Sequence, residues 1–308
     1  MRLPITDEVV EQELLGAMSI VTNVYGSPIH RYMGPITLQE AGVTEEGYTW
    51  ETDDGALRIM DVSDTCLYEF RALETKNGCV YLIGDSLSNE RKGQRERVIL
   101  HQSVPFSDRK SAVCISTHHK YREHTLPVIL KSLKKAAFDM SRVYVSVAAC
   151  SKQTNYEENG VQYRELTGDY HGFTALPVAA VEEKEVDYWF LLHDTCAVDA
   201  DFSAKLSGID VGLNPDMVLF RKPSENLEIG LYHSDFLAAV VSELPRVGPS
   251  RALDGFVANA RIAIVLDCNV RDEGQKDIYG NGTSRKILSM PSVGVRKFKA
   301  KAADGGKP

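Results

Sequence analysis

A short acidic segment follows an apolar run near the middle of the chain and holds the residues best suited to chemistry. The run YWFLL (188–192) leads directly into HDTCAVDADF, which contains Asp194, Asp199 and Asp201. Carboxylate oxygens are the ligands that hard cations prefer. An acid after a strand is also a common turn former or helix cap, and we favour that role for Asp199 and Asp201. Asp194 is therefore the leading candidate for a functional carboxylate.

Three histidines, His118, His119 and His124, lie close together in the sequence and at first suggest a metal site. No cysteine or carboxylate is spaced to complete a zinc site with them. We therefore place them on a loop and the start of a helix, and expect only His118 to contact a ligand. The sequence contains no GxSxG, GxxxxGK[ST] or HExxH motif, so serine hydrolases, P-loop NTPases and zincins fit poorly.

The elements predicted around these residues alternate between strand and helix. Strands are expected at 111–117, 142–150 and 188–192, and helices at about 122–138 and 172–183. The strands are apolar throughout, which indicates a mostly parallel sheet covered on both faces. The sequence therefore predicts an α/β fold from the first of these strands onward.

Polar clusters follow each of the three strands, at 116–120, 150–154 and 193–201. Ligands of parallel sheets bind beyond the carboxyl ends of the strands. We therefore expect the three clusters to converge on one crevice.

The first third of the chain has a different pattern. Residues 9–20 have the apolar spacing of a helix, and from Tyr25 to His101 short β-prone runs alternate with turn residues. This pattern predicts a small antiparallel sheet or barrel-like module, in which we identify no chemistry. We predict three parts: a small β-rich accessory domain (1–107), a main domain (108–298) and a disordered tail (299–308).

The segment LHDTCAVDADF (Leu192–Phe202) and the sequences on either side of it resemble the motif region of GT-A type glycosyltransferases of the family 2 kind. Upstream, GDYHGFTALPVAAVEEKEVDYWFLL resembles the family's glycine-bearing helix. Downstream, MVLFRKPSENLEIGLYHSDFLAAV resembles its acceptor-side segment. The resemblance covers roughly residues 111–261. It implies a mostly parallel nucleotide-binding sheet flanked by helices, to which a small N-terminal β-rich domain is added.

The same resemblance implies a nucleotide-sugar donor and assigns residues to it. Ser116, Thr117 and His118 lie where the family holds the nucleobase and ribose. Arg122 is a candidate phosphate partner, because a guanidinium fork suits phosphate oxygens. Asp194 is the retained acid of the motif and completes the predicted donor-binding set.

A divalent cofactor, Mn²⁺ or Mg²⁺, is also implied, because the family uses one to neutralise the leaving diphosphate. The two aspartates that usually flank the motif are His193 and Thr195 here. Asp194 would then hold the ion with help from His193 or from the distant His233, since Mn²⁺ tolerates imidazole. Alternatively, basic residues take the place of the metal.

The resemblance implies an enzyme that moves a sugar from a nucleoside-diphosphate donor to a hydroxyl of a glycan or a lipid-linked saccharide. An inverting enzyme needs a carboxylate base, for which Asp254 is the first candidate and Asp235 the second. Asp254 precedes a glycine and fits a helix cap equally well. Because the acidic motif is depleted, a non-catalytic nucleotide- or glycan-binding protein is the alternative.

Composition narrows the class of protein further. The chain has 308 residues, is 43% hydrophobic and carries a net charge of −8, which argues against a nucleic-acid partner. Six widely spaced cysteines and the absence of a signal-peptide core favour reduced thiols in the cytoplasm. The basic cluster Arg296–Lys299 fits a solvated face, with phosphate or peripheral membrane contact as the alternative.

Overall fold

The computed structural model describes residues 5–24, 27–76, 79–87, 96–169, 171–181, 185–220, 229–241, 259–266, 270–272 and 287–298. The chain divides into two compact units. The first, here called the barrel unit, comprises Met1–Pro105, Asp210–Pro215 and Arg261–Val265. The second, here called the sheet unit, comprises Phe106–Ile209, Asp216–Ala260 and Leu266–Pro308.

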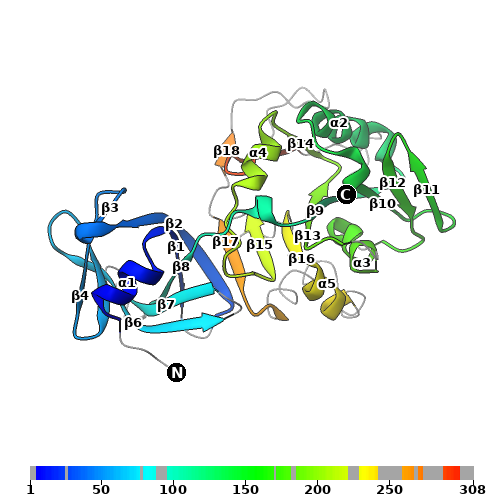
Figure 1. Ribbon diagram of the computed structural model, residues 1–308. Helices are drawn as coiled ribbons and strands as arrows, with labels where there is room; N and C mark the ends of the chain where they lie inside the picture. Colours follow the sequence, from blue (N-terminus) through cyan, green and yellow to red (C-terminus); the bar gives the residue numbers. More distant parts are fainter. Residues whose placement is uncertain are drawn as a thin grey trace. The chain divides into compact units, whose positions relative to one another are not determined.

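The barrel unit is built from eight antiparallel strands that close on themselves, drawn in blue to cyan in Figure 1. Neighbouring strands run in the order β1-β8-β7-β6-β5-β4-β3-β2, and β1 also pairs with β2 to close the ring. One further strand, β17, pairs with β2 in parallel. The elements are α1 (Asp7–Glu13), β1 (Gly16–Val24), β2 (Ile29–Gln39), η1 (Glu40–Gly42), β3 (Val43–Thr44), β4 (Thr49–Asp53), β5 (Ala56–Met60), β6 (Cys66–Lys76), β7 (Cys79–Ser86), β8 (Glu96–Gln102) and β17 (Ala263–Leu266).

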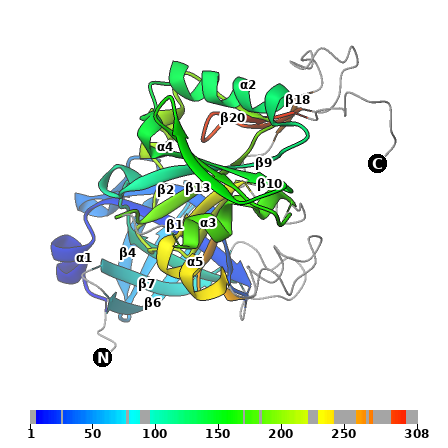
Figure 2. The same cartoon turned by 90° about the vertical axis from the view of Figure 1, so that its right-hand side faces the viewer.

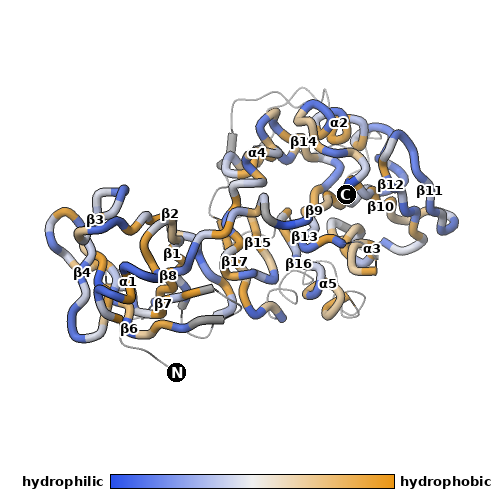
Figure 3. Tube along the Cα trace, viewed as in Figure 1, coloured by the Kyte–Doolittle hydropathy of each residue, from blue (hydrophilic) through white to orange (hydrophobic). Residues whose placement is uncertain are grey.

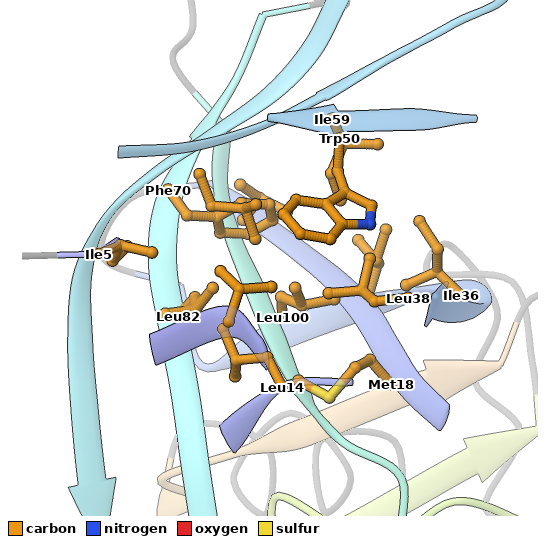
Figure 4. Close-up of a cluster of buried hydrophobic side chains, with 14 of the residues drawn as sticks. Ile5, Leu14, Met18, Ile36, Leu38, Trp50, Ile59, Phe70, Leu82 and Leu100 are labelled. Atoms are coloured by element: carbon orange, nitrogen blue, oxygen red, sulfur yellow. The ribbon is translucent and has the colours of Figure 1, made fainter. Parts of the chain in front are cut away.

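Alternating apolar side chains of these strands fill the interior of the barrel. In this cluster Trp50 and Phe70 pack with aliphatic side chains and a methionine from six strands and from the α1 segment, and Figure 4 shows many of them. The Trp50 indole N–H donates to the carbonyl oxygens of Gln39 and Val43, at 3.0 and 3.1 Å, so the buried ring has no unsatisfied donor. Helix α1 contributes its buried Val10 to the same core.

The sheet unit contains a seven-strand sheet and a smaller antiparallel sheet. The larger runs in the order β15-β16-β13-β9-β10-β12-β11, and the smaller in the order β14-β20-β19-β18. The strands are β9 (Ser111–His118), β10 (Val143–Ala148), β11 (Thr154–Glu158), β12 (Val161–Glu165), β13 (Tyr188–His193), β14 (Cys196–Val198), β15 (Met217–Phe220), β16 (Gly230–His233), β18 (Val270–Asp272), β19 (Ile287–Met290) and β20 (Val295–Lys297).

The helices of the sheet unit are few and mostly short. They are η2 (Phe106–Asp108), α2 (Arg122–Lys135), η3 (Met140–Arg142), η4 (His171–Phe173), α3 (Ala175–Val181), α4 (Phe202–Ser207) and α5 (Ser234–Val240). Helices α3 and α5 pack side by side (Figure 2), and α3 also contacts β9, β10 and β13. Among the described residues, no helix combines the length and the apolar character that a membrane crossing requires.

The predicted fold class, a mostly parallel α/β sheet flanked by helices, is wrong for this chain. The structure is mostly antiparallel β, with a closed eight-strand barrel and only 23% helix. Among the described residues of the sheet unit, parallel pairing is found in the run β13-β9-β10-β12, and β16, β15 and β11 join it antiparallel. A continuous apolar run indicates that a strand is buried on both faces. It does not fix the direction of the neighbouring strand, so it could not exclude antiparallel pairing.

Burial along the sheet explains where polar chemistry can occur. Strand β13 is buried from Tyr188 to Leu192 and becomes accessible only at His193, while the edge strand β11 is hydrophilic along its length (Figure 3). The described cysteine side chains, at positions 66, 114, 150 and 196, are free thiols. Asp254 and the predicted tail at 299–308 lie outside the described residues.

Candidate functional site

Asp194 lies directly after β13 and accepts two side-chain hydrogen bonds on a single oxygen. The Thr117 hydroxyl donates to Asp194 Oδ2 at 2.6 Å, and the Thr125 hydroxyl donates to the same atom at 2.5 Å. The Asp194 backbone N–H also donates to the carbonyl oxygen of Ser116, at 3.1 Å. We call this arrangement of Thr117, Asp194 and Thr125 the Thr–Asp–Thr clamp.

Two consecutive elements, β9 and α2, and the distant turn after β13 build the clamp. Thr117 lies near the carboxyl end of β9, which pairs in parallel with β13, and Thr125 lies in the first turn of α2. Both threonines are buried, with exposed fractions of 5% and 1%. Hydrogen bonds to an ionised carboxylate are roughly twice as strong as neutral ones, so the clamp fixes the orientation of Asp194.

The other residues predicted at the end of β9 have different surroundings. The buried Ser116 hydroxyl accepts the backbone N–H of Ala175, at 3.0 Å, and so fixes the start of α3. His118 is partly exposed; its Nδ1 accepts the Lys120 backbone N–H at 3.1 Å. Its ring lies 5.7 Å from that of Tyr121. Of the two side chains, His118 is the one that a ligand can reach.

Arg122 opens helix α2 and binds a carboxylate from β12. Its Nη1 donates to Glu165 Oε1 at 2.6 Å, and the Thr154 hydroxyl donates to Glu165 Oε2 at 2.5 Å. The Thr154 hydrogen bond and the Arg122 contact together hold the pKa of Glu165 below its usual value. The guanidinium is therefore fixed at the helix start with its charge partly compensated.

Lys297 also lies in this region, although it is about a hundred residues further along the chain than His193. Strand β20 pairs antiparallel with β14, so that Cys196 lies opposite Lys297. The Lys297 ammonium donates to His193 Nδ1 at 3.0 Å. Sequence reasoning grouped Lys297 with a basic surface cluster, and only the pairing of two distant strands reveals its position.

His233 and Asp235 lie at the opposite end of β13. Strand β16 pairs antiparallel with β13, which places His233 opposite Tyr188 and therefore five residues, or about 16 Å, from His193. There His233 Nδ1 accepts the Asp235 backbone N–H at 3.2 Å and caps α5, while Asp235 is exposed in the first turn of that helix. The structure does not bring either residue together with Asp194.

Comparison with known proteins gives only distant likenesses. The sequence matches no protein-family model and no curated protein. It is similar to the solved structure of S. aureus TarS 1–349 (13% identity, TM-score 0.33), covering 51% of this chain and 58% of that one. It is also similar to TarS 1–349 in complex with UDP-GlcNAc, with 12% identity and a TM-score of 0.36, covering 56% of this chain and 61% of that one. A third similar structure is the glycosyltransferase GlyE of Streptococcus pneumoniae TIGR4, with 13% identity and a TM-score of 0.34, covering 51% of this chain and 45% of that one.

This chain therefore spans less than two thirds of the solved structures that it resembles. They include a glycosyltransferase and a protein solved with a nucleotide sugar. At these scores the function of this chain has to be inferred from its own site.

The side chains predicted to hold a divalent ion do not fit one in this arrangement. His193 uses Nδ1 to accept from the Lys297 ammonium, and its Nε2 atom is buried. Asp194 Oδ2 is occupied by two hydroxyl donors, and His233 lies at the far end of the strand. Among the described residues, no group of three or more His, Cys, Asp and Glu side chains is placed to bind a metal.

Proposed function

We propose that this protein transfers a sugar from a nucleoside-diphosphate donor to a hydroxyl acceptor. The observation that carries the proposal is the carboxylate of Asp194, fixed at the carboxyl end of β13, with two cations on neighbouring residues: Lys297 bonds to the adjacent His193, and Arg122 opens the helix that supplies Thr125. Sugar hydroxyls and a diphosphate require these two kinds of partner, an acceptor of hydrogen bonds and a source of positive charge.

Each part of the site has a role in such a reaction. The Thr–Asp–Thr clamp holds a carboxylate ready to accept hydrogen bonds from ribose or sugar hydroxyls. Helix α2 begins at the same place, and the positive end of a 14-residue helix favours a phosphate group. The partly exposed rings of His118 and Tyr121 offer a surface on which a nucleobase can stack. Positive charge placed in advance stabilises the leaving diphosphate in the transition state.

The proposal extends to inversion at the anomeric carbon and to a glycan or lipid-linked saccharide as acceptor. Inversion requires one carboxylate base, and Asp254 keeps that role by its sequence position. Asp235 is not proposed as the base, because it lies at the end of β13 away from Asp194.

The proposal is tested by measuring turnover of UDP- and GDP-sugars by the wild-type protein, by Asp194→Ala and by Asp235→Ala. We expect Asp194→Ala to lower kcat/KM by about 100-fold or more, as for the loss of a fixed polar group in an active site. Asp235→Ala should retain the wild-type value. Thermal unfolding of each variant checks that the loss is not one of folding.

Two results would argue against the proposal. Equal turnover by Asp194→Ala and the wild type would remove the assigned site. Nucleotide-sugar binding without transfer across a broad acceptor panel would instead favour a non-catalytic nucleotide- or glycan-binding protein.

A further inference from the structure

We infer that Lys297, rather than a divalent ion, provides the positive charge that binds the diphosphate of the donor. The inference rests on the proposed function and assigns the site a ligand group, the pyrophosphate of a nucleoside diphosphate. Its basis is the position of one lysine beside the turn that carries Asp194.

The first step is the contact between Lys297 and His193. An ammonium group has three donors and no acceptor, so His193 Nδ1 must accept this 3.0 Å hydrogen bond through its lone pair. That lone pair is the one a metal ion would require. Lys297 itself is partly exposed, and a single bond to His193 leaves its ammonium with further donor capacity.

The second step is the backbone that holds Lys297 in place. Besides the antiparallel pairing of β20 with β14, the Phe298 backbone N–H donates to the Thr195 carbonyl oxygen at 2.9 Å. Phe298 is buried against Ala197. The lysine is thus fixed through its neighbours to the same turn that follows β13.

The charges of Asp194 and Lys297 lie near the same buried residue. Cys196, whose side chain is buried, lies opposite Lys297 in the pairing of β14 with β20 and two residues after Asp194. A divalent ion added there would meet an ammonium group already in place, whereas a diphosphate would be attracted by it.

Lys297 differs in its partner from Lys205, another lysine of the sheet unit. Lys205 in α4 forms an ion pair with Asp201 at 3.0 Å, an arrangement typical of an exposed helix face. Among the described residues, no carboxylate lies within ion-pair distance of the Lys297 ammonium. Its hydrogen-bond partner is an imidazole nitrogen and not a carboxylate, which leaves the positive charge available to an anion.

The inference is tested by calorimetric titration of UDP and of inorganic pyrophosphate, each in EDTA and in Mn²⁺. The wild type should bind both ligands in EDTA, with affinities that Mn²⁺ leaves unchanged. Lys297→Met should weaken both by at least about tenfold, because a charge-assisted hydrogen bond is lost. Lys205→Met is the matched control and should bind as the wild type does. Lys297→Arg keeps the charge and should retain most of the affinity, even if the Met variant is unstable.

Three outcomes would overturn the inference: binding that requires Mn²⁺, wild-type affinity in Lys297→Met, or no binding of either ligand. Its failure can be distinguished from that of the proposed function. Sugar transfer that depends on Mn²⁺ would retain the function and remove the role of Lys297. Pyrophosphate binding that depends on Lys297, without any binding of UDP or turnover of nucleotide sugars, would retain the phosphate site and remove the transferase.

Discussion

The two ends of β13 carry similar residue types but use them differently. At the carboxyl end, Asp194 accepts from two threonine hydroxyls, and His193 accepts from a lysine. At the amino end, several polar side chains bind backbone groups, although Lys110 also forms an ion pair with Glu185. His233 accepts the N–H of Asp235, and Asp187 accepts the N–H of Lys110 at 2.8 Å.

This difference separates a structural cluster from a candidate site. Side chains bonded to backbone groups complete the ends of helices and strands, where N–H and C=O groups lack partners. Bonds between side chains are a small minority of all hydrogen bonds in proteins, and they fix polar groups relative to one another. The carboxyl end of β13 therefore holds a carboxylate fixed by other side chains, whereas His233 and Asp187 at the amino end bind backbone N–H groups.

The strongest test of this comparison removes both hydroxyls of the clamp. Thr117→Val together with Thr125→Val keeps the side-chain shapes and leaves Asp194 without two donors. We expect the free energy of unfolding to fall by about 1–3 kcal/mol, because a partly buried carboxylate loses its partners. Urea denaturation measures this loss, and steady-state kinetics should show a larger fall in kcat than rise in KM.

Ser234→Ala provides the matched control at the amino end. It removes the hydroxyl that donates to the Val186 carbonyl oxygen at 2.5 Å. This variant should lose stability but keep wild-type turnover of nucleotide sugars. If it lowers turnover as much as the double valine variant does, the two ends of β13 are not functionally distinct.

A smaller effect is expected from the pH dependence of the His233 cap. Burial lowers the pKa of His233. The negative charges of Asp235, Asp216 and Asp187 raise it by less, so the pKa stays below its usual value. The unfolded chain therefore takes up the proton first as pH falls. The stability from this group is complete above the unfolded value of about 6.5 and is lost as pH falls toward the lower folded value. Protonation also removes the lone pair that accepts from Asp235.

His233→Asn tests this dependence, because asparagine caps a helix without titrating near neutral pH. Melting temperatures between pH 8 and pH 5 should fall less for the variant than for the wild type. The buried His30 and His101, whose pKa values burial also lowers, contribute equally to both proteins and cancel in the difference. Curves that stay parallel over this range would show that His233 does not act as the cap in solution.

Local structure in the sheet unit was predictable from hydrophobic periodicity. The strand expected at 111–117 is β9, the one expected at 188–192 is β13, and the helix expected from about 122 begins at Arg122. The first and third polar clusters do meet, through the bond between Thr117 and Asp194. The positions of these strands and of this helix depend on residues close together in the chain, which is the range over which periodicity is informative.

The wrong fold class and the wrong position of His233 share one physical cause, the direction of a neighbouring strand. A parallel neighbour would have brought His233 to the same edge as Asp194, and the antiparallel β16 places it at the other end. Thr125 has no distinguishing feature in the sequence, because only the packing of α2 turns its hydroxyl toward Asp194. Lys297 depends on the pairing of β20 with β14 across about a hundred residues. No local pattern encodes such pairings.

The smallest expected effect is the contribution of Glu165, at the carboxyl side of the sheet, to the loss of stability in acid. Its pKa is lowered first by the Thr154 hydrogen bond and then by Arg122. A lowered carboxylate pKa adds stability above the unfolded value of about 4.3, and this stability is lost as pH falls through the lower folded value. Melting temperatures of Glu165→Gln should therefore fall less steeply than those of the wild type between about pH 5 and pH 3.

Glu123→Gln is the control, because this carboxylate also contacts Arg122, at 3.2 Å, but is 87% exposed. Exposed ion pairs contribute little, so its acid slope should match that of the wild type. If both variants keep the wild-type slope, Glu165 does not hold Arg122 in solution. The charge of the guanidinium would then be uncompensated by Glu165, and Arg122 would contribute more strongly, beside Lys297, to binding the diphosphate.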